Sequence, residues 1–176
     1  MKFIFVITLM ATFGMANAQD YCKLIKKEVI DNTTYNYESP YKEDSVPVMR
    51  VMRNYSTNAD YEYDNFNLIV QIPCEFADLI GKTADGGEAE KEETKMIIEF
   101  EDKTKLTDDT LQVTHVKSDD GSAARVAYYP LTPQNIKTLT AKKIAKVYLA
   151  SASATVPADI AAAIPQYILC LTKVKK

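Results

Sequence analysis

Residues 94–149 constrain the fold most, because they contain two hairpin signals, a helix start and a closing strand in unbroken succession. The side chains on one face of the first strand are Met96, Ile98 and Phe100. A polar turn follows this strand. A three-residue loop, either 101–103 or 102–104, returns Leu106 to the face of Ile98, whereas a two-residue loop would reverse it. We therefore predict a three-residue loop.

The same segment predicts a second hairpin and a short helix. Residues 118–122 are turn formers between two strand-like arms. Thr132 and Pro133 have the pattern of a hydroxyl N-cap followed by proline at the first helical position, which predicts a helix over residues 133–140. Residues 144–150 then form a last strand.

The N-terminal half predicts four further strands. Three of them span residues 21–30, 33–37 and 46–55. The fourth has the clearest alternation, and its core-facing residues are Phe66, Leu68, Val70 and Ile72. Pro73 is expected to end it.

Residues 81–94 include an acidic run and predict a mobile surface loop. The alternative is a segment that collects cations or a basic partner.

The C-terminal segment has helical periodicity. Its apolar stripe consists of Ile160, Ile164, Tyr167, Ile168 and Leu171. Pro157 suits the helix start, and Pro165 is expected to kink the helix or remove one hydrogen bond. The chain therefore predicts one α+β domain, a largely antiparallel sheet of about seven to nine strands with both helices on one face. A β-sandwich is the alternative, and it leaves the helical stripe unexplained.

Residues 1–18 have the pattern of a signal peptide. Lys2 precedes an apolar run too short to span a bilayer, and Ala16 and Ala18 form a small-x-small cleavage site. We expect export to the periplasm or exterior, residues 19–176 as a single domain, and no stable membrane insertion after cleavage. The 24 acidic and 21 basic residues give no basic face of the kind that binds nucleic acid.

The sequence favours binding over catalysis. His115 is the only histidine, and it falls in a strand pattern that packing explains better than nucleophilic catalysis. His115 with Asp119 and Asp120 is a weak metal signal. A second set of alternating carboxylates consists of Asp60, Glu62 and Asp64. This set lacks the glycine and the distal acid of a calcium loop. We predict no catalytic residue, no metal and no cofactor.

Tyrosine is enriched before residue 65. Tyrosines bury a large area at low entropic cost and serve as recognition anchors, although they are also ordinary strand residues. The candidate binding residues are Tyr35, Tyr37, Tyr41, Tyr55, Tyr61 and Tyr63. We predict a non-enzymatic module that binds a protein, peptide or glycan. The alternative is a carboxylate-based hydrolase of the cell envelope, which needs a cleft with two close carboxylates and opposed pKa shifts.

Several structural motifs are distributed over most of the chain. They are Cys-Lys-x-Ile-x-Lys-Glu-Val at 22–29, Ile-Ile-x-Phe-Glu-Asp-x-Thr-Lys-Leu at 97–106, Pro-Leu-Thr-Pro-x-x-Ile-x-x-Leu with Ile-x-x-Val-x-Leu within 130–149, and Cys170 followed by leucine. Together they resemble a group of small secreted bacterial proteins of unknown function. The resemblance implies a domain type without catalytic residues. Members often have glycine where this chain has Lys103, so the turn is expected to be more strained here.

The three cysteines allow at most one internal disulfide. An exported chain meets an oxidising compartment, where disulfides form and persist. The resemblance places its cysteines near the two ends of the chain, and chain termini often lie close together. We therefore predict a Cys22–Cys170 disulfide, with Cys74 as a mostly buried thiol outside it.

We predict that the exported protein begins at Gln19, because cleavage is expected after Ala18. The measured intact mass should equal that of residues 19–176, with or without cyclisation of Gln19 to pyroglutamate. A soluble species that retains residues 1–18 would contradict the assignment of the leader.

Overall fold

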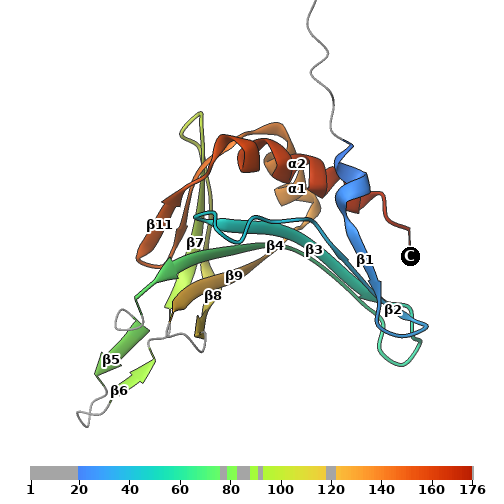
Figure 1. Cartoon of the computed structure of the whole chain (residues 1–176), viewed down its shortest axis with the longest axis horizontal. Coiled ribbons are helices and arrows are strands. Elements are labelled where there is room, and N and C mark those ends of the chain that lie inside the picture. Colours follow the sequence, from blue (N-terminus) through green and yellow to red (C-terminus); the bar gives the residue numbers. More distant parts are fainter. Residues whose placement is uncertain (1–19, 76–78, 83–87, 91–92, 118–121, 176) are drawn as a thin grey trace, which may run out of the picture.

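A nine-stranded antiparallel sheet with two helices on one side forms the fold (Figure 1). The computed structural model describes residues 20–75, 79–82, 88–90, 93–117 and 122–175. The strands of the main sheet are β1 (Lys26–Val29), β2 (Thr34–Glu38), β3 (Val48–Ser56), β4 (Tyr63–Cys74), β7 (Glu93–Phe100), β8 (Lys105–Lys117), β9 (Ala123–Pro130), β10 (Ile144–Leu149) and β11 (Ala152–Thr155). The other elements are the 3-10 helix η1 (Tyr21–Leu24), the helices α1 (Pro133–Ala141) and α2 (Ala158–Thr172), and the separate pair β5 (Ile80–Lys82) and β6 (Glu88–Glu90).

Two antiparallel meanders build the sheet, in the order β1-β2-β3-β4-β9-β8-β7-β10-β11. β9 joins them by pairing with β4, where Leu68 lies opposite Tyr129. α1 then carries the chain to β10, which pairs with the other side of β7. The predicted α+β class is confirmed. The β-sandwich alternative is wrong, because the described core contains one continuous sheet and not two packed sheets.

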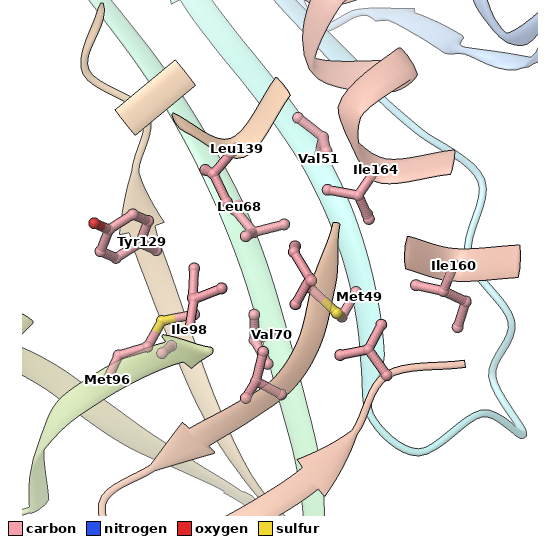
Figure 2. Close-up of a cluster of buried hydrophobic side chains, with 14 of the residues drawn as sticks. Met49, Val51, Leu68, Val70, Met96, Ile98, Tyr129, Leu139, Ile160 and Ile164 are labelled. Carbon is pink, nitrogen blue, oxygen red and sulfur yellow. The ribbon is translucent and has the colours of Figure 1, made fainter. Parts of the chain in front are cut away.

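The core lies between the sheet and the helices. Every residue of the predicted helical stripe is buried, and α2 continues through Pro165. Figure 2 shows Ile160 and Ile164 of α2 beside Met49 and Val51 of β3. The buried side chains that complete this cluster from the sheet and α1 include Leu68, Val70, Met96, Ile98, Tyr129 and Leu139. The predicted core faces of β4 and β7 are therefore confirmed, except that Phe66 is only partly buried.

The first hairpin closes as predicted. Ile98 lies opposite Leu106, and the amide of Phe100 donates to the carbonyl of Thr104, so the loop consists of residues 101–103. Lys103 has a left-handed backbone, with φ of 66°. Three-residue hairpin loops require this conformation at their last position, and glycine adopts it at the least cost. Lys103 therefore bears backbone strain that a glycine would relieve.

The predicted helix start is also confirmed. The Thr132 hydroxyl oxygen accepts a hydrogen bond from the amide of Asn135 at 3.2 Å, and Pro133 occupies the first helical position. This satisfies one of the amides that a helix N-terminus leaves unpaired. Leu139 is fully buried on the inner face of α1.

Two predicted elements differ in type. Residues 21–24 form η1 and not the start of a strand, and β1 begins only at Lys26. The physical reason is that Cys22 is bonded to α2, while the adjacent pair Leu24 and Ile25 breaks the alternation of a strand. The mobile loop predicted over residues 81–94 is wrong in its described part, because β5 pairs with β6 and Glu93 begins β7. Residues 83–87, 91–92 and the turn at 118–121 lie outside the described residues.

One strand boundary and one whole strand also differ from the predictions. Pro73 lies inside β4, although we expected it to end this strand. β3 begins at Val48, opposite Gln71, so Pro73 extends past β3 and borders only β9. Its missing amide therefore removes no hydrogen bond to β3. β11 was not predicted, because this short edge strand has no large apolar side chain to mark it.

We expect Ile98→Ala to lower the free energy of unfolding by about 3 kcal/mol, because it leaves a cavity in a closed core. Ile98 has no exposed surface, whereas Ile97 lies on the other face and is half-buried. Ile97→Ala should therefore cost clearly less. Urea unfolding of the two variants measures the difference, and a larger loss for Ile97→Ala would contradict the assignment of faces.

Candidate functional site

An apolar groove of about 480 Å³ is the candidate binding site. It lies between η1, the segment that joins β2 to β3, and α2. Its lining residues are Tyr21, Leu24, Pro40, Tyr41, Lys42, Met49, Asp159, Ile160, Ala162, Ala163, Ile164 and Tyr167. A concave and mostly apolar surface with few polar groups is typical of a ligand site.

The floor of the groove is a continuation of the protein core. Met49, Ile160 and Ile164 line it and are also buried members of the core cluster (Figure 2). The rim is more open, since Leu24 is 39% exposed and Tyr41 is 42% exposed. The groove therefore combines a closely packed floor with a rim that a ligand can reach.

The wall formed by η1 is attached to α2. Cys22 and Cys170 form the predicted disulfide, with their Cα atoms 5.3 Å apart. Cys74 lies outside this bridge and is half-buried. The rings of Tyr21 and Tyr167 meet edge to face, with centroids 5.3 Å apart. Because no residue of η1 is fully buried, these contacts position the wall.

One ion pair lies at the mouth of the groove. The ammonium of Lys42 donates to the carboxylate of Asp159, which joins the β2–β3 segment to the first turn of α2. This hydrogen bond holds the pKa of Asp159 below its ordinary value and raises the pKa of Lys42. The two side chains are 62% and 56% exposed, so solvent screens their attraction and the pair can yield to a ligand.

Among the six predicted tyrosines, Tyr41 reaches the groove. The guanidinium carbon of Arg50 lies 5.0 Å from the centroid of its ring. Arg50 also pairs with Glu38 at 2.5 Å, and Glu38 and Arg50 extend from β2 and β3. These contacts hold the ring of Tyr41, a partly exposed residue, at the rim of the groove, where a ligand can contact it.

The next three predicted tyrosines pack on one another. The ring centroids of Tyr35 and Tyr55 are 5.2 Å apart, and those of Tyr37 and Tyr55 are 6.1 Å apart. Tyr55 is buried, and its hydroxyl donates to the carbonyl of Lys175. Burial raises the pKa of Tyr55, with the neighbouring Tyr37 adding to the effect. These contacts assign Tyr55 to packing, while Tyr35 and Tyr37 remain half-buried.

The last two predicted tyrosines are separate from the groove. Tyr61 is 52% exposed and Tyr63 is half-buried at the start of β4, and neither lines the groove. The nearby carboxylate of Asp64 is held by two hydrogen bonds from Arg53, at 2.8 and 2.9 Å. The structure therefore does not collect the six tyrosines into one surface.

A buried charged cluster lies in the main sheet, outside the groove. Glu93 binds the guanidinium of Arg125 at 2.5 and 3.1 Å, and Nε2 of His115 lies 3.2 Å from its carboxylate. At most 11% of any of these side chains is exposed. Burial raises the pKa of Glu93, but the hydrogen bonds from Arg125 and His115 outweigh it, so the pKa lies below its ordinary value. His115 has the predicted strand position, but its partner Glu93 was assigned to a loop.

Sequence reasoning missed Tyr21 and Tyr167 as groove residues. The sequence pattern places Tyr21 in a strand and Tyr167 only in the apolar stripe of the C-terminal helix. A signal was present, because Tyr21 precedes Cys22 and Tyr167 lies one helical turn before Cys170. The predicted bridge therefore already implied that these two rings approach each other.

We expect Glu93→Gln to lower the free energy of unfolding by about 3 kcal/mol near neutral pH, because it removes the negative charge that binds the buried guanidinium of Arg125. The lowered pKa means that wild-type Glu93 contributes fully above its ordinary value of 4.5 and loses its contribution as the pH falls through the folded-state pKa. The variant should therefore lose less stability than the wild type on acidification. Urea unfolding across this pH range measures the difference, with the exposed Glu101→Gln as the matched control. If Glu93→Gln and Glu101→Gln lowered the free energy of unfolding near neutral pH by the same amount, this result would contradict the role of Glu93.

The described part of the chain contains no group of three or more histidine, cysteine or acidic residues placed to hold a metal ion. None of its helices has the length and apolar character needed to cross a membrane. The disulfide is typical of proteins that fold in oxidising compartments.

Searches against models of known protein families, curated proteins and solved structures found no match to this chain.

Proposed function

We propose that the protein is an exported, non-enzymatic module that binds a peptide segment by taking its apolar side chains into the groove between η1 and α2. The single observation that carries this proposal is the groove of about 480 Å³, with a core-packed floor and an accessible aromatic rim. The leader sequence and the disulfide support export.

The chemistry of the lining favours a peptide with apolar anchors. Three tyrosines, Tyr21, Tyr41 and Tyr167, face the groove from three different segments of the chain. Aromatic walls contribute a large contact area at low entropic cost, and aromatic-lined grooves are a recurring mode of peptide recognition. Lys42 and Asp159 provide one donor and one acceptor at the mouth. They suit the backbone amides of a peptide that lies across the groove.

A glycan is a less suitable occupant. The chain contains no tryptophan, and the polar groups of the lining are few compared with the many hydroxyls of a sugar. Each buried hydroxyl without a hydrogen-bond partner would cost free energy. The groove therefore favours a peptide over a glycan as its ligand.

The alternative of a carboxylate hydrolase has less support. It needs two close carboxylates that face one cavity and have opposed pKa values. Asp159 is the one carboxylate in the described lining of the groove, and it is paired with Lys42. A second cavity, of about 430 Å³, is lined by Ile72, Pro73, Cys74, Arg125, Ser151, Ala152 and Ser153, without a carboxylate among these described residues. Neither lining provides the acid and base that glycoside hydrolysis uses.

Selection from a random linear-peptide library, with the oxidised protein as the target, should yield sequences that share apolar or aromatic anchors. Fluorescence anisotropy of one labelled library peptide then gives its dissociation constant. Ala163→Trp should weaken binding of this peptide at least tenfold, because Ala163 lines the groove and is half-buried and the larger side chain occupies the space of the anchor.

Gln166→Trp is the matched control. Gln166 is exposed on the same helix and does not line the groove, so binding should be unchanged. An equal effect of both substitutions, or no effect of Ala163→Trp, would contradict the groove as the peptide site. Failure to select any peptide, with binding on a glycan array instead, would overturn the peptide class.

A further inference from the structure

We propose that the Cys22–Cys170 disulfide is a redox switch for the groove, so that its reduction by a dithiol releases η1 and abolishes peptide binding while the sheet stays folded. This inference rests on the proposed function, because it concerns control of the same site. Three observations carry it: the weak attachment of η1, the accessibility of the bridge, and the place of η1 in the groove wall.

The wall element has little to hold it once the bridge opens. η1 is a single four-residue turn with no fully buried residue and no side-chain cap. The amide of Lys23 donates to the carbonyl of Asp20 at 3.0 Å and closes the first turn of this short helix. One turn of helix is not stable by itself in water. η1 also contacts α2 through the edge-to-face pair of Tyr21 and Tyr167.

The sheet is held together by contacts that do not involve η1. β1, which follows η1, pairs with β2 over four residues, from Lys26 opposite Glu38 to Val29 opposite Tyr35. The core cluster is built mainly by residues of the sheet, α1 and α2, and η1 contributes only the partly buried Tyr21 at its margin. Release of η1 therefore stops at β1 and leaves the core packed.

The bridge is accessible and shares an open cavity with two lysines. Cys22 is exposed and Cys170 is half-buried. Both line an open cavity of about 330 Å³ together with Lys27 and Lys173. The ammonium of Lys27 is held over the rings of Tyr35 and Tyr37, at 5.1 and 5.6 Å from their centroids. Neighbouring cations stabilise a thiolate, so they favour both the approach of an attacking thiolate and the departure of a cysteine thiolate.

The exchange reaction has two steps. A thiolate of the dithiol attacks one sulfur of the bridge, which breaks the bond between Cys22 and Cys170 and forms a mixed disulfide with the reductant. The second thiol of the reductant then displaces the protein sulfur. Two electrons and two protons pass to the protein, which gains two thiols, and the reductant leaves as its own disulfide.

Loss of the bridge removes one wall of the groove. Tyr21 and Leu24 are the groove residues of η1, and they depart with it. The opposite wall and the floor remain, because Met49, Ile160 and Ile164 are held by the core. A ligand then loses an aromatic contact surface, and it also has to reorder η1 in order to regain this surface.

The test compares binding of the labelled library peptide to the oxidised protein and to the protein reduced with dithiothreitol. We expect affinity to fall at least tenfold on reduction, with an unchanged far-UV circular dichroism spectrum and faster amide hydrogen exchange confined to residues 20–25. The Cys22→Ser/Cys170→Ser variant should bind as weakly as the reduced protein and should not respond to dithiothreitol. Cys74→Ser, which keeps the bridge, should respond as the wild type does.

The outcomes separate the two proposals. If the oxidised protein does not bind the peptide in the groove, the proposed function fails. If the oxidised protein binds and the reduced protein binds equally well, the switch fails and the function stands. Reduction also removes the stability that the chain-entropy account assigns to a disulfide closing a long loop. Loss of the sheet signal on reduction would therefore show global unfolding and would overturn the local switch.

Discussion

Burial of the apolar face of α2 is the interaction on which the rest of the structure depends. Ile164, Ile168 and Leu171 have almost no exposed surface, and each fully buried aliphatic side chain contributes about 1.5–3 kcal/mol. The sheet also completes the C-terminal end of this helix. Arg53 of β3 donates to the carbonyl of Leu171 at 2.8 Å and to the carbonyl of Val174 at 3.2 Å. A cation from the sheet thus satisfies the end of a helix whose last turn contains no basic residue.

Most of the fold could be predicted because its signals are local. The alternation in β4 and β7, the Thr132 cap and the spacing of the C-terminal stripe each act within a few residues. The elements that were missed depend on the element that they contact, which their own residues do not indicate. β11 is a strand because β10 offers it an edge, and η1 is a helical turn because Cys22 meets Cys170. The polar composition of residues 81–94 predicts a loop, although Glu93 in this segment belongs to a buried charged cluster.

The candidate site was harder to predict for the same reason. Its residues come from three separate parts of the chain, and the core explains most of them equally well. Enrichment in tyrosine indicated recognition, but it could not distinguish Tyr41, which reaches the groove, from Tyr55, which is buried under the C-terminal tail. The predicted disulfide was the most informative element, because this single covalent contact places η1, one wall of the groove, against α2.

The bridge also has a mechanical consequence. It joins residues that are 148 positions apart, so nearly the whole described domain lies inside one covalent ring. When tension is applied between the two ends of the chain, it passes from Cys22 directly to Cys170 and does not load the strands between them. The sheet is therefore shielded from a pulling force as long as the bridge is closed. Once the bridge is opened, the same force acts first on β1, the four-residue edge strand whose residues are all exposed.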